Sequence, residues 1–548
     1  MNTLKSIFAI LILIVLTPVY ASEDDNPLRI ENLTSISSIV NPATLELAKS
    51  VNAAPEWRNF IPPQAFWSPD GSKLLIRSTI GWYKDDINFH PSNRNGIGAI
   101  YVMDSDGTNL TKIVSNEINN RSKPIEFPSS LSWSPSGDKI AITVYRNFYL
   151  LANPDGKGLI ALGTNFSDII TIITNLSELS RQKDLIWSPD GTKAVFVVND
   201  PDKIYITDAD GSNIKQLAGE VNEPFLKARA WSHDGERIAF SGRNLWIMNS
   251  DGTNLRQFGD CWGGVWSPDD SKVLCMSSEE VNDQYIRHLY LINLNSGDKT
   301  EITKSVEVGD PAWNPDSNNI LFVSLTERRN LGIFVYDSQG RSVKLIYEEN
   351  NPLEKATLIS VSWSPDGSKI TFTVSENGIG LYTINPDGTG KILISSNLTG
   401  GYAWSPSGDK IAFSSSTANG EHIFIANPDG TERTQITTGE NKHYVLSGMG
   451  GSWSPDGSRL LIESSTYRAS RNEVFIAKLS GYGRTMPTRV PGLMKQGEEK
   501  RSPEPNLTVT PETTKSITAA TTPEAPGFDG ALAVAILSAI YLFKRRYN

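Results

Sequence analysis

The chain has 548 residues, of which 39% are hydrophobic and 20% are charged, so it is long enough to bury a large apolar core. Its formal net charge at pH 7 is −10, whereas a nucleic-acid-binding surface needs a basic patch. The composition therefore argues against a nucleic-acid partner, and we expect none.

The first residues are predicted to be a targeting segment. Lys5 precedes an apolar run from Ile7 to Leu16, and Val19 and Ala21 are small residues at the −3 and −1 positions of a cleavage site. This order is typical of a secretory signal peptide over residues 1–21, cut after Ala21. The alternative is an uncleaved N-terminal anchor helix, although the apolar run is short for a membrane span.

Residues 22–59 carry no repeat and form a lead segment before the main domain. We expect one short helix from Asn41 to Ala48, because proline is favoured in the first turn of a helix and Pro42 would lie there. Open sheet edges must be covered, so we hypothesise that part of this lead adds a strand to the last repeat of the domain that follows and closes a ring.

From residue 60 to residue 486 one pattern returns nine times. It is W-S-P-D-G-S-K-L-L at its first copy, and the tryptophans of successive copies lie between 35 residues (Trp231 to Trp266) and 66 residues (Trp67 to Trp133) apart. Repetition at this period, with strands, is typical of β-propeller blades. The repeat-defining residues are Trp67, Trp133, Trp187, Trp231, Trp266, Trp313, Trp363, Trp404 and Trp453.

Each copy predicts four antiparallel strands. In the turn Ser-Pro-Asp-Gly after the tryptophan, proline presets φ, aspartate accepts backbone N–H groups and glycine takes a positive φ. An alternating strand such as 237–240 follows, then a third strand such as 204–207, a second turn such as 208–211, and a short fourth strand. One such sheet cannot bury both faces, so neighbours must stack around an axis. The fold class is therefore all-β, a single β-propeller with eight or nine four-stranded blades over residues 60–486.

These turns and strands resemble the repeat of TolB-type β-propellers, which are relatives of the WD-repeat proteins. In the copy at Trp231, His233 replaces proline, and in the next copy Asp270 replaces glycine. Asn314 and Ser317 alter the copy at Trp313. The resemblance implies a binding scaffold more often than an enzyme, and it does not name the ligand.

The two faces of the predicted ring differ. Both turn motifs are short and lie on one face, which we call the tight-turn face. The connections from second to third strand and from blade to blade lie on the other, variable-loop face, where long irregular insertions such as 79–98, 279–287 and 438–450 fall. Because variable loops on a rigid scaffold often bind ligands, we predict the binding site there.

The richest of these loops begins at Trp82, where aromatic residues beside charges suit a sugar or protein surface. The alternative is that Trp82 packs under its own loop and that the arginines are only solvated. The candidate ligand-binding residues are Trp82, Tyr83, Asp85, His90, Arg94, Arg328, Arg329, His443, Tyr444, Tyr467 and Arg468.

The two cysteines, Cys261 and Cys275, flank the turn after Trp266 on two strands of one hairpin. As opposite or diagonal neighbours on one face they could form a disulfide in an oxidising compartment. The alternative is a pair of buried free thiols.

Seven Asn-x-Ser/Thr sequons are candidates for N-glycosylation of an exported chain, although such tripeptides also occur by chance. They begin at Asn32, Asn109, Asn120, Asn165, Asn175, Asn397 and Asn506.

Beyond residue 486 the composition changes. Residues 487–525 are rich in Pro, Thr, Ser and Glu, which is typical of an extended, O-glycosylated stalk. Residues 526–548 hold Pro526, Gly527 and Phe528, an apolar run and a basic end. This order resembles the archaeal C-terminal sorting signal that an archaeosortase processes. The resemblance implies removal of the helix and transfer of the new terminus to a lipid; the alternative is an ordinary transmembrane anchor. Either way we expect a membrane-anchored protein at the cell surface.

The sequence lacks the common motifs for catalysis and metal binding. The Asp-x-Asp-Gly turns lack the alternating ligands and the closing glutamate of a calcium loop. The sequence has no Gly-x-Ser-x-Gly elbow and no His-Glu-x-x-His motif. We therefore predict no catalytic residue, no metal and no cofactor. One enzyme alternative stays open, because a ring could gather some of the five scattered histidines at its axis, as a propeller polysaccharide lyase would require.

The sequence thus favours a non-enzymatic scaffold, exported and anchored at an archaeal cell surface, that binds a protein or a glycan. The alternatives are a glycan-active enzyme, such as that lyase, and a structural component of the envelope.

Overall fold

The computed structural model describes residues 28–50, 59–82, 95–116, 130–145, 148–162, 185–198, 203–217, 221, 227–349, 357–375, 378–439, 442–447, 452–466 and 469–480. The predicted signal peptide, stalk and sorting signal lie outside these residues. Within the described ranges, no helix is long and apolar enough to cross a membrane.

Six four-stranded sheets follow one another along the chain, and in each sheet the strands pair in sequence order. The first three sheets contain β2 (Asn59–Trp67), β3 (Lys73–Trp82), β4 (Asn95–Asp104) and β5 (Thr111–Asn116); β6 (Ser130–Trp133), β7 (Ile140–Tyr145), β8 (Phe148–Ala152) and β9 (Ile160–Leu162); and β10 (Ile186–Trp187), β11 (Lys193–Val198), β12 (Lys203–Asp208) and β13 (Lys215–Leu217). The next three contain β14 (Lys227–Trp231), β15 (Arg237–Ser241), β16 (Leu245–Asn249) and β17 (Arg256–Gln257); β18 (Trp262–Trp266), β19 (Lys272–Val281), β20 (Gln284–Asn293) and β21 (Lys299–Ser305); and β22 (Ala312–Trp313), β23 (Asn319–Leu325), β24 (Leu331–Asp337) and β25 (Ser342–Glu348).

The remaining strands join in one eleven-stranded sheet. They are β26 (Thr357–Trp363), β27 (Ile370–Ser375), β28 (Ile379–Ile384), β29 (Ile392–Trp404), β30 (Ile411–Thr417), β31 (Gly420–Ala426), β32 (Thr434–Gln435), β33 (Lys442–Leu446), β34 (Arg459–Thr466), β35 (Ala469–Ser480) and β1 (Arg29–Ser35). The sheet is continuous because β29 pairs with β28 through its first part and with β30 through its second part, and because β31 pairs in parallel with β33.

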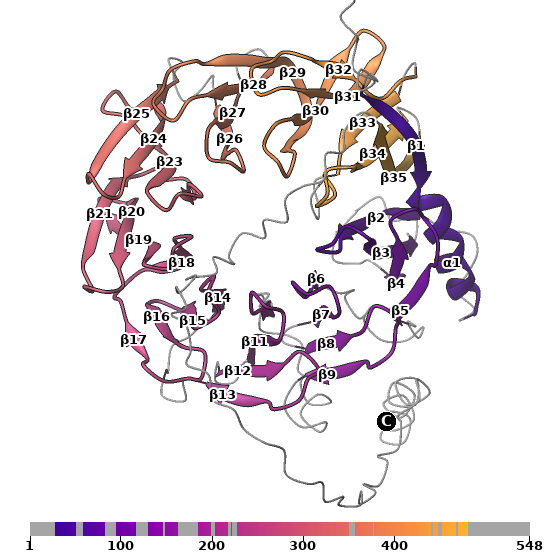
Figure 1. Cartoon of the computed structure of the whole chain (residues 1–548), viewed down its shortest axis with the longest axis horizontal. Coiled ribbons are helices and arrows are strands. Elements are labelled where there is room, and N and C mark those ends of the chain that lie inside the picture. Colours follow the sequence, from indigo (N-terminus) through magenta and orange to yellow (C-terminus); the bar gives the residue numbers. More distant parts are fainter. Residues whose placement is uncertain are drawn as a thin grey trace, which may run out of the picture.

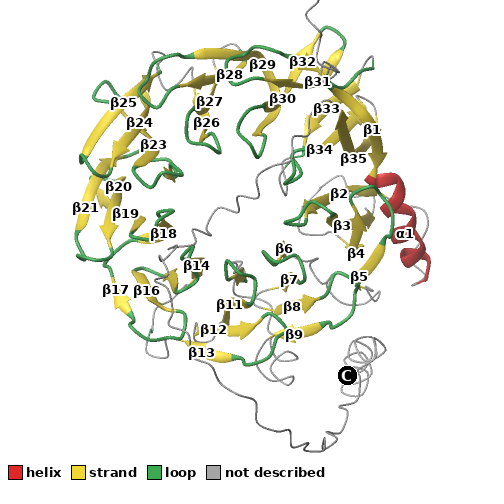
Figure 2. Cartoon of the chain, viewed as in Figure 1, coloured by secondary structure: helices red, strands yellow, loops and turns green. Residues whose placement is uncertain are grey.

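The sheets stand around a central axis, with the first strand of each unit innermost and the fourth outermost (Figure 1). The turns after the innermost strands project toward the centre of the ring (Figure 2). The prediction of an all-β propeller is confirmed by this topology. The core lies between adjacent sheets: Val195 and Val197 on β11, for example, pack with Ile238 and Phe240 on β15. Burial of each such side chain stabilises the ring by about 1.5–3 kcal/mol.

The repeat tryptophans join each unit to the one before it. In six of them the indole N–H donates to the backbone carbonyl of the residue that precedes the tryptophan of the previous repeat, at 3.1–3.3 Å. Trp187 donates instead to the hydroxyl of Ser132. Among the described residues, the indole N–H groups of Trp67 and Trp404 are buried without an acceptor. Tryptophan suits this position because it combines a large apolar body with one N–H donor.

The N-terminal lead lies at the end of the ring. β1 pairs antiparallel with β35, from Arg29 opposite Ser480 to Ser35 opposite Phe475, and is the outermost strand there. The first and last repeats also meet at their turns, since a Cβ built on Gly71 would lie 3.3 Å from Cδ of Pro455. The two ends of the ring therefore touch at both its rim and its turns.

The helix of the lead differs from its prediction. α1 spans Ile36–Ser50, so it begins before Asn41, and Pro42 lies inside it rather than in its first turn. The start is set by Ser35, whose hydroxyl accepts the backbone N–H of Ser38 at 3.1 Å and so caps the helix. Val40 is fully buried in the cluster that α1 shares with the first sheet and with β35. The prediction was wrong because the capping serine was overlooked.

Two departures from the repeat meet between neighbouring units. In standard copies the turn glycine packs on the proline of the preceding turn; a Cβ on Gly137 would lie 3.6 Å from Pro69. Asp270, at the glycine position, accepts hydrogen bonds from the backbone N–H groups of His233 and Asp234 and contacts the His233 ring Nδ1, each at 2.8 Å. Replacing proline creates a backbone N–H, and the new carboxylate accepts it, so the two departures compensate each other.

Candidate functional site

Most of the predicted ligand-binding residues cannot be placed. Tyr83, Asp85, His90, Arg94, Tyr467 and Arg468 lie outside the described residues. Trp82 ends β3, where its backbone pairs with Asn95. Arg328 and Arg329 lie exposed in the β23–β24 turn, where Arg328 Nη1 is 3.8 Å from Glu348 Oε2.

The long insertion over residues 279–287 was predicted to be an irregular loop, and this was wrong. β19 and β20 stay paired as far as Val281 and Gln284, and only Asn282 and Asp283 form the turn. Both have positive φ, at 50° and 60°, which suits the two-residue turn of a tight hairpin. The variable-loop face therefore presents extended hairpins as well as loops.

Three of the seven sequons fall on described residues. Asn32 on β1 and Asn397 on β29 are exposed. Asn109 lies in a tight turn with φ of 57°, and its amide donates to Asp104 Oδ2 at 2.6 Å. The other four sequons lie outside the described residues.

The cysteines are joined: Cys261 and Cys275 form a disulfide with a Cα–Cα distance of 5.7 Å. Both are buried in the same cluster as Trp266.

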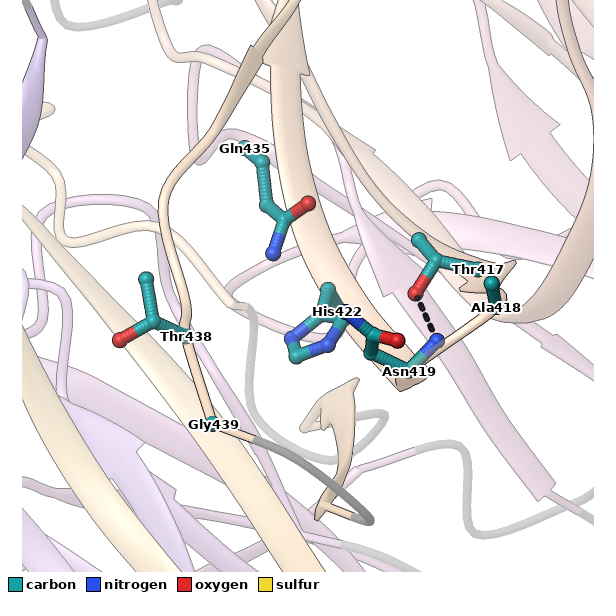
Figure 3. Close-up of a pocket in the computed structure, with 7 residues that line it drawn as sticks. All are labelled: Thr417, Ala418, Asn419, His422, Gln435, Thr438 and Gly439. Atoms are coloured by element: carbon teal, nitrogen blue, oxygen red, sulfur yellow. Dashed lines mark hydrogen bonds between the residues drawn. The ribbon is translucent and has the colours of Figure 1, made fainter.

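A pocket of about 360 Å³ opens on the variable-loop face, at the end of the β30–β31 hairpin. Figure 3 shows its lining, in which the side chain of Gln435 points toward His422. The lining residues are Thr417, Ala418, Asn419, His422, Gln435, Thr438 and Gly439. They come from the hairpin, from the end of β32 and from the segment that follows it. None of them carries a full charge when His422 is neutral.

One close backbone approach positions this pocket. Gly420 pairs in parallel with Lys442 on β33, and its φ is 131°. A Cβ there would lie 2.3 Å from the Lys442 carbonyl oxygen, so only glycine fits. The contact holds the hairpin against β33 and sets the pocket at the junction of two four-stranded units.

His422 is the most buried polar group in the lining, with 1% of its surface exposed. Burial lowers its pKa below the ordinary value, so the imidazole is neutral near pH 7. Its Nδ1 lies 3.3 Å from the hydroxyl of Thr437, which accepts the backbone N–H of Ile423 at 2.9 Å. Because the hydroxyl can donate as well as accept, Nδ1 can pair with it in either tautomer, and Nε2 is the ring nitrogen that remains for a ligand.

Hydrogen bonds hold the Gln435 side chain and the backbone at Asn419 beside His422. Gln435 Nε2 donates to the Thr437 carbonyl at 2.8 Å, so its Oε1 is oriented as an acceptor. The Asn419 backbone N–H donates to Thr417 Oγ1 at 3.2 Å, the dashed line in Figure 3. The pocket thus offers donors and acceptors held in place by the fold.

Two of the predicted residues lie beside this pocket rather than in its lining. The ring of Tyr444 is 6.2 Å from that of His422, and His443 Nδ1 is 3.4 Å from Glu421 Oε2. His422 itself was counted only among the scattered histidines. The available signal was a histidine at the start of the otherwise apolar run 422–426, in a strand buried on both faces.

Over the ranges that the structure describes, no group of three or more His, Cys, Asp or Glu side chains is placed to hold a metal ion.

Comparison with known proteins gives low similarity. No family model matches the chain. Dipeptidyl-peptidase 5 of Porphyromonas gingivalis is 29% identical over 136 residues, which cover 20% of this chain and only 18% of that protein. The solved oligogalacturonate lyase in complex with manganese is 16% identical with a TM-score of 0.37, over 55% of this chain and 88% of the lyase. TolB from Acinetobacter baumannii is 16% identical with a TM-score of 0.26, over 57% of this chain and 79% of TolB. By its own strand topology the chain is a β-propeller, and TolB is among the proteins that it resembles in structure.

Proposed function

We propose that this chain is an exported, surface-anchored propeller of nine blades that acts as a binding scaffold and not as an enzyme. The nine blades are the six four-stranded sheets and three units of the eleven-stranded sheet, which share β29 and include β1. The partner binds on the variable-loop face, and the observation that carries the proposal is the polar pocket at His422.

The chemistry of this pocket favours an uncharged carbohydrate over a protein segment. Its lining presents two amides, two threonine hydroxyls and a neutral imidazole, which can each pair with sugar hydroxyl groups. An acidic sugar or a charged peptide would need a counter-charge that the lining does not offer. Each neutral hydrogen bond contributes about 1 kcal/mol net, and about 4 kcal/mol corresponds to a millimolar Kd, so one sugar alone would bind weakly.

Export and surface attachment are part of the same proposal. They are supported by the predicted signal peptide over 1–21 and by the resemblance of 526–548 to a sorting signal. The disulfide between Cys261 and Cys275 suits an oxidising compartment outside the cytoplasm.

The proposal is tested by binding of the mature protein to an array of neutral, acidic and sulfated glycans, followed by titration of each hit. We expect a neutral glycan to bind, and Gln435→Ala and Asn419→Ala to weaken it at least tenfold. Gln257→Ala, which removes an exposed amide on β17 far from the pocket in sequence, is the matched control and should bind as the wild type does.

Equal binding by the pocket variants would remove the site assignment. Binding only to protein partners would leave the scaffold role but exclude the carbohydrate. Metal-dependent cleavage of a uronate polymer would replace the proposal with the lyase alternative.

A further inference from the structure

A second, smaller cavity lies between the sheet of β18–β21 and the sheet of β22–β25, at the tight-turn ends of their strands. Its volume is about 40 Å³. One sheet contributes Lys272, Leu291, Asn293, Asp298 and Thr300, and the other contributes Tyr336, Ser338 and Arg341. It shares no residue with the pocket at His422.

The other repeats serve as an internal control for Lys272. The lysine that begins the second strand normally donates to an oxygen at the end of the third strand, as Lys193 does to Asp208 Oδ1 at 2.6 Å and Lys369 to Asn385 Oδ1 at 2.5 Å. Lys272 Nζ donates to the hydroxyl of Ser271 at 3.3 Å and, among the described residues, makes no hydrogen bond to a carboxylate or amide oxygen, although its charge acts on Asp269.

The reason lies in the turn that follows β20. Asn293 stands where the acceptor should be, but its Oδ1 accepts the backbone N–H groups of Asn295 and Ser296 at 3.0 and 3.1 Å. Gly297 N–H bonds to the Asn293 carbonyl, whereas the standard turn closes one residue earlier, as Gly211 does on Asp208. The extra residue turns the Asn293 side chain onto its own loop and leaves Lys272 without its usual acceptor.

Two further donors in the same lining make no hydrogen bond to the described residues; Tyr336 is buried, whereas Arg341 is exposed to solvent. The hydroxyl of Tyr336 is buried with no hydrogen-bond partner, and the residue is only 3% exposed. Burial raises the pKa of Tyr336, so the phenol keeps its proton. Arg341 has no carboxylate within ion-pair distance over the described ranges, although its charge acts on Tyr336.

The nearby carboxylates are already engaged. Asp298 Oδ2 accepts the hydroxyl of Ser296 at 2.7 Å. Asp337, which lies outside the lining, accepts the backbone N–H groups of Gln339 and Gly340. Asp269, also outside the lining, interacts with the charge of Lys272 without a hydrogen bond to its ammonium. A buried donor without an acceptor, such as the Tyr336 hydroxyl, costs about 1–3 kcal/mol.

We propose that this cavity binds one tetrahedral oxyanion, a sulfate or phosphate group. The unprotonated oxygens of such a group are acceptors for the Lys272 ammonium, the Arg341 guanidinium and the Tyr336 hydroxyl, and hydrogen bonds between charged donors and an anion are among the strongest in proteins. The group can come from a free ion or from the end of a larger ligand, such as a sulfated sugar.

The test is calorimetric titration of the full mature protein with sodium sulfate, sodium phosphate and galactose 6-sulfate, against sodium chloride at matched ionic strength. We expect saturable binding of an oxyanion and none of chloride. Tighter binding of the sulfated sugar than of free sulfate would identify a carried group as the source, and the reverse order a free ion.

Three variants locate the site. Lys272→Met and Arg341→Gln should each weaken oxyanion binding at least tenfold. Lys369→Met removes the same charge at the equivalent position of another repeat, where the lysine has its acceptor, and should bind as the wild type does.

Tyr336→Phe distinguishes loss of oxyanion binding at the site from loss of binding through misfolding. It removes a buried hydroxyl that has no partner, so the free protein should melt no lower than the wild type while its oxyanion affinity falls severalfold. The proposal is overturned if the wild type shows no saturable binding beyond chloride, or if Lys369→Met weakens binding as much as Lys272→Met.

Discussion

The tight-turn face and the variable-loop face are built from the same repeats, yet they are constrained differently. On the tight-turn face one local network returns: the serine after the tryptophan donates to the turn aspartate and accepts a backbone N–H from the following lysine, as in Ser68, Asp70 and Lys73 at 2.6 and 2.9 Å. Ser364, Asp366 and Lys369 repeat it at the same two distances.

On the variable-loop face the corresponding contacts differ from unit to unit. The β19–β20 hairpin extends to a two-residue turn, whereas the β30–β31 hairpin is held by a parallel bridge to β33. The difference teaches that the four-residue turn sets one end of each blade locally, while the other end is free to vary. On the tight-turn face, contacts differ between units where the motif departs, as at His233 and Asp270, at Asn314 and in the turn after Asn293.

The largest expected effect tests whether the repeats alone hold the ring. Deletion of residues 22–50 removes β1 and α1, exposes the edge of β35 and loses the buried Ile36 and Val40. Since each such side chain contributes about 1.5–3 kcal/mol, we expect a loss of more than about 3 kcal/mol and a sharp fall in Tm. Leu33→Ser, a partly exposed position on β1, is the control. An unchanged thermal melt of the deletion variant would refute a role of the lead in closing the ring.

A smaller effect tests the repeated contact between blades. Trp363 donates its indole N–H to the Ala312 carbonyl at 3.1 Å, whereas the equally buried Trp67 has no acceptor among the described residues. Replacing either by phenylalanine removes similar apolar area, but only Trp363→Phe also removes a hydrogen bond between units. We expect it to cost about 1 kcal/mol more in urea unfolding than Trp67→Phe. Equal losses would mean that the indole N–H bonds do not contribute to stability.

The smallest effect tests the exception on the tight-turn face. The hydrogen bond to Asp270 raises the pKa of His233. Burial would raise the pKa of Asp270, but hydrogen bonds from His233 and Asp234 hold it below its ordinary value. The stabilisation of the folded state by His233 is therefore fully present below about pH 6.5 and is lost as pH rises through its raised pKa. The stabilisation by Asp270 is present above about pH 3.9 and is lost as pH falls through its lowered pKa.

Stability measured from pH 5 to 9 should accordingly decline more at high pH in the wild type than in His233→Ala, which keeps the backbone N–H. Because His233 is 39% exposed, solvent screening limits the difference to less than about 1 kcal/mol.

A double variant, His233→Pro with Asp270→Gly, restores the standard repeat. It should lower the free energy of unfolding by less than the sum of the two single variants. Additive losses would show that the two departures are independent.

The turns show how far the sequence predicts this structure. The serine, aspartate and glycine of each turn act within six residues, and Gly71 has the positive φ of 71° that its place in the motif requires. The sequence signals at Ser35 and at Asn282–Asp283 were equally local, so the early start of α1 and the extended hairpin could have been found. The pocket could not, because it depends on Gly420 meeting Lys442 across a junction between units.

By itself, the sequence determined the repeated four-stranded unit, its turns and the uneven distribution of insertions between the two faces, because these follow from hydrogen bonds and alternation between near neighbours. Only the tertiary structure decided that His233 faces Asp270, that His422 lines a polar pocket and that Lys272, Tyr336 and Arg341 share one cavity. Each of these contacts joins residues of different units or segments. The partners in each contact depend on how neighbouring units stack around the axis, and not on the local sequence.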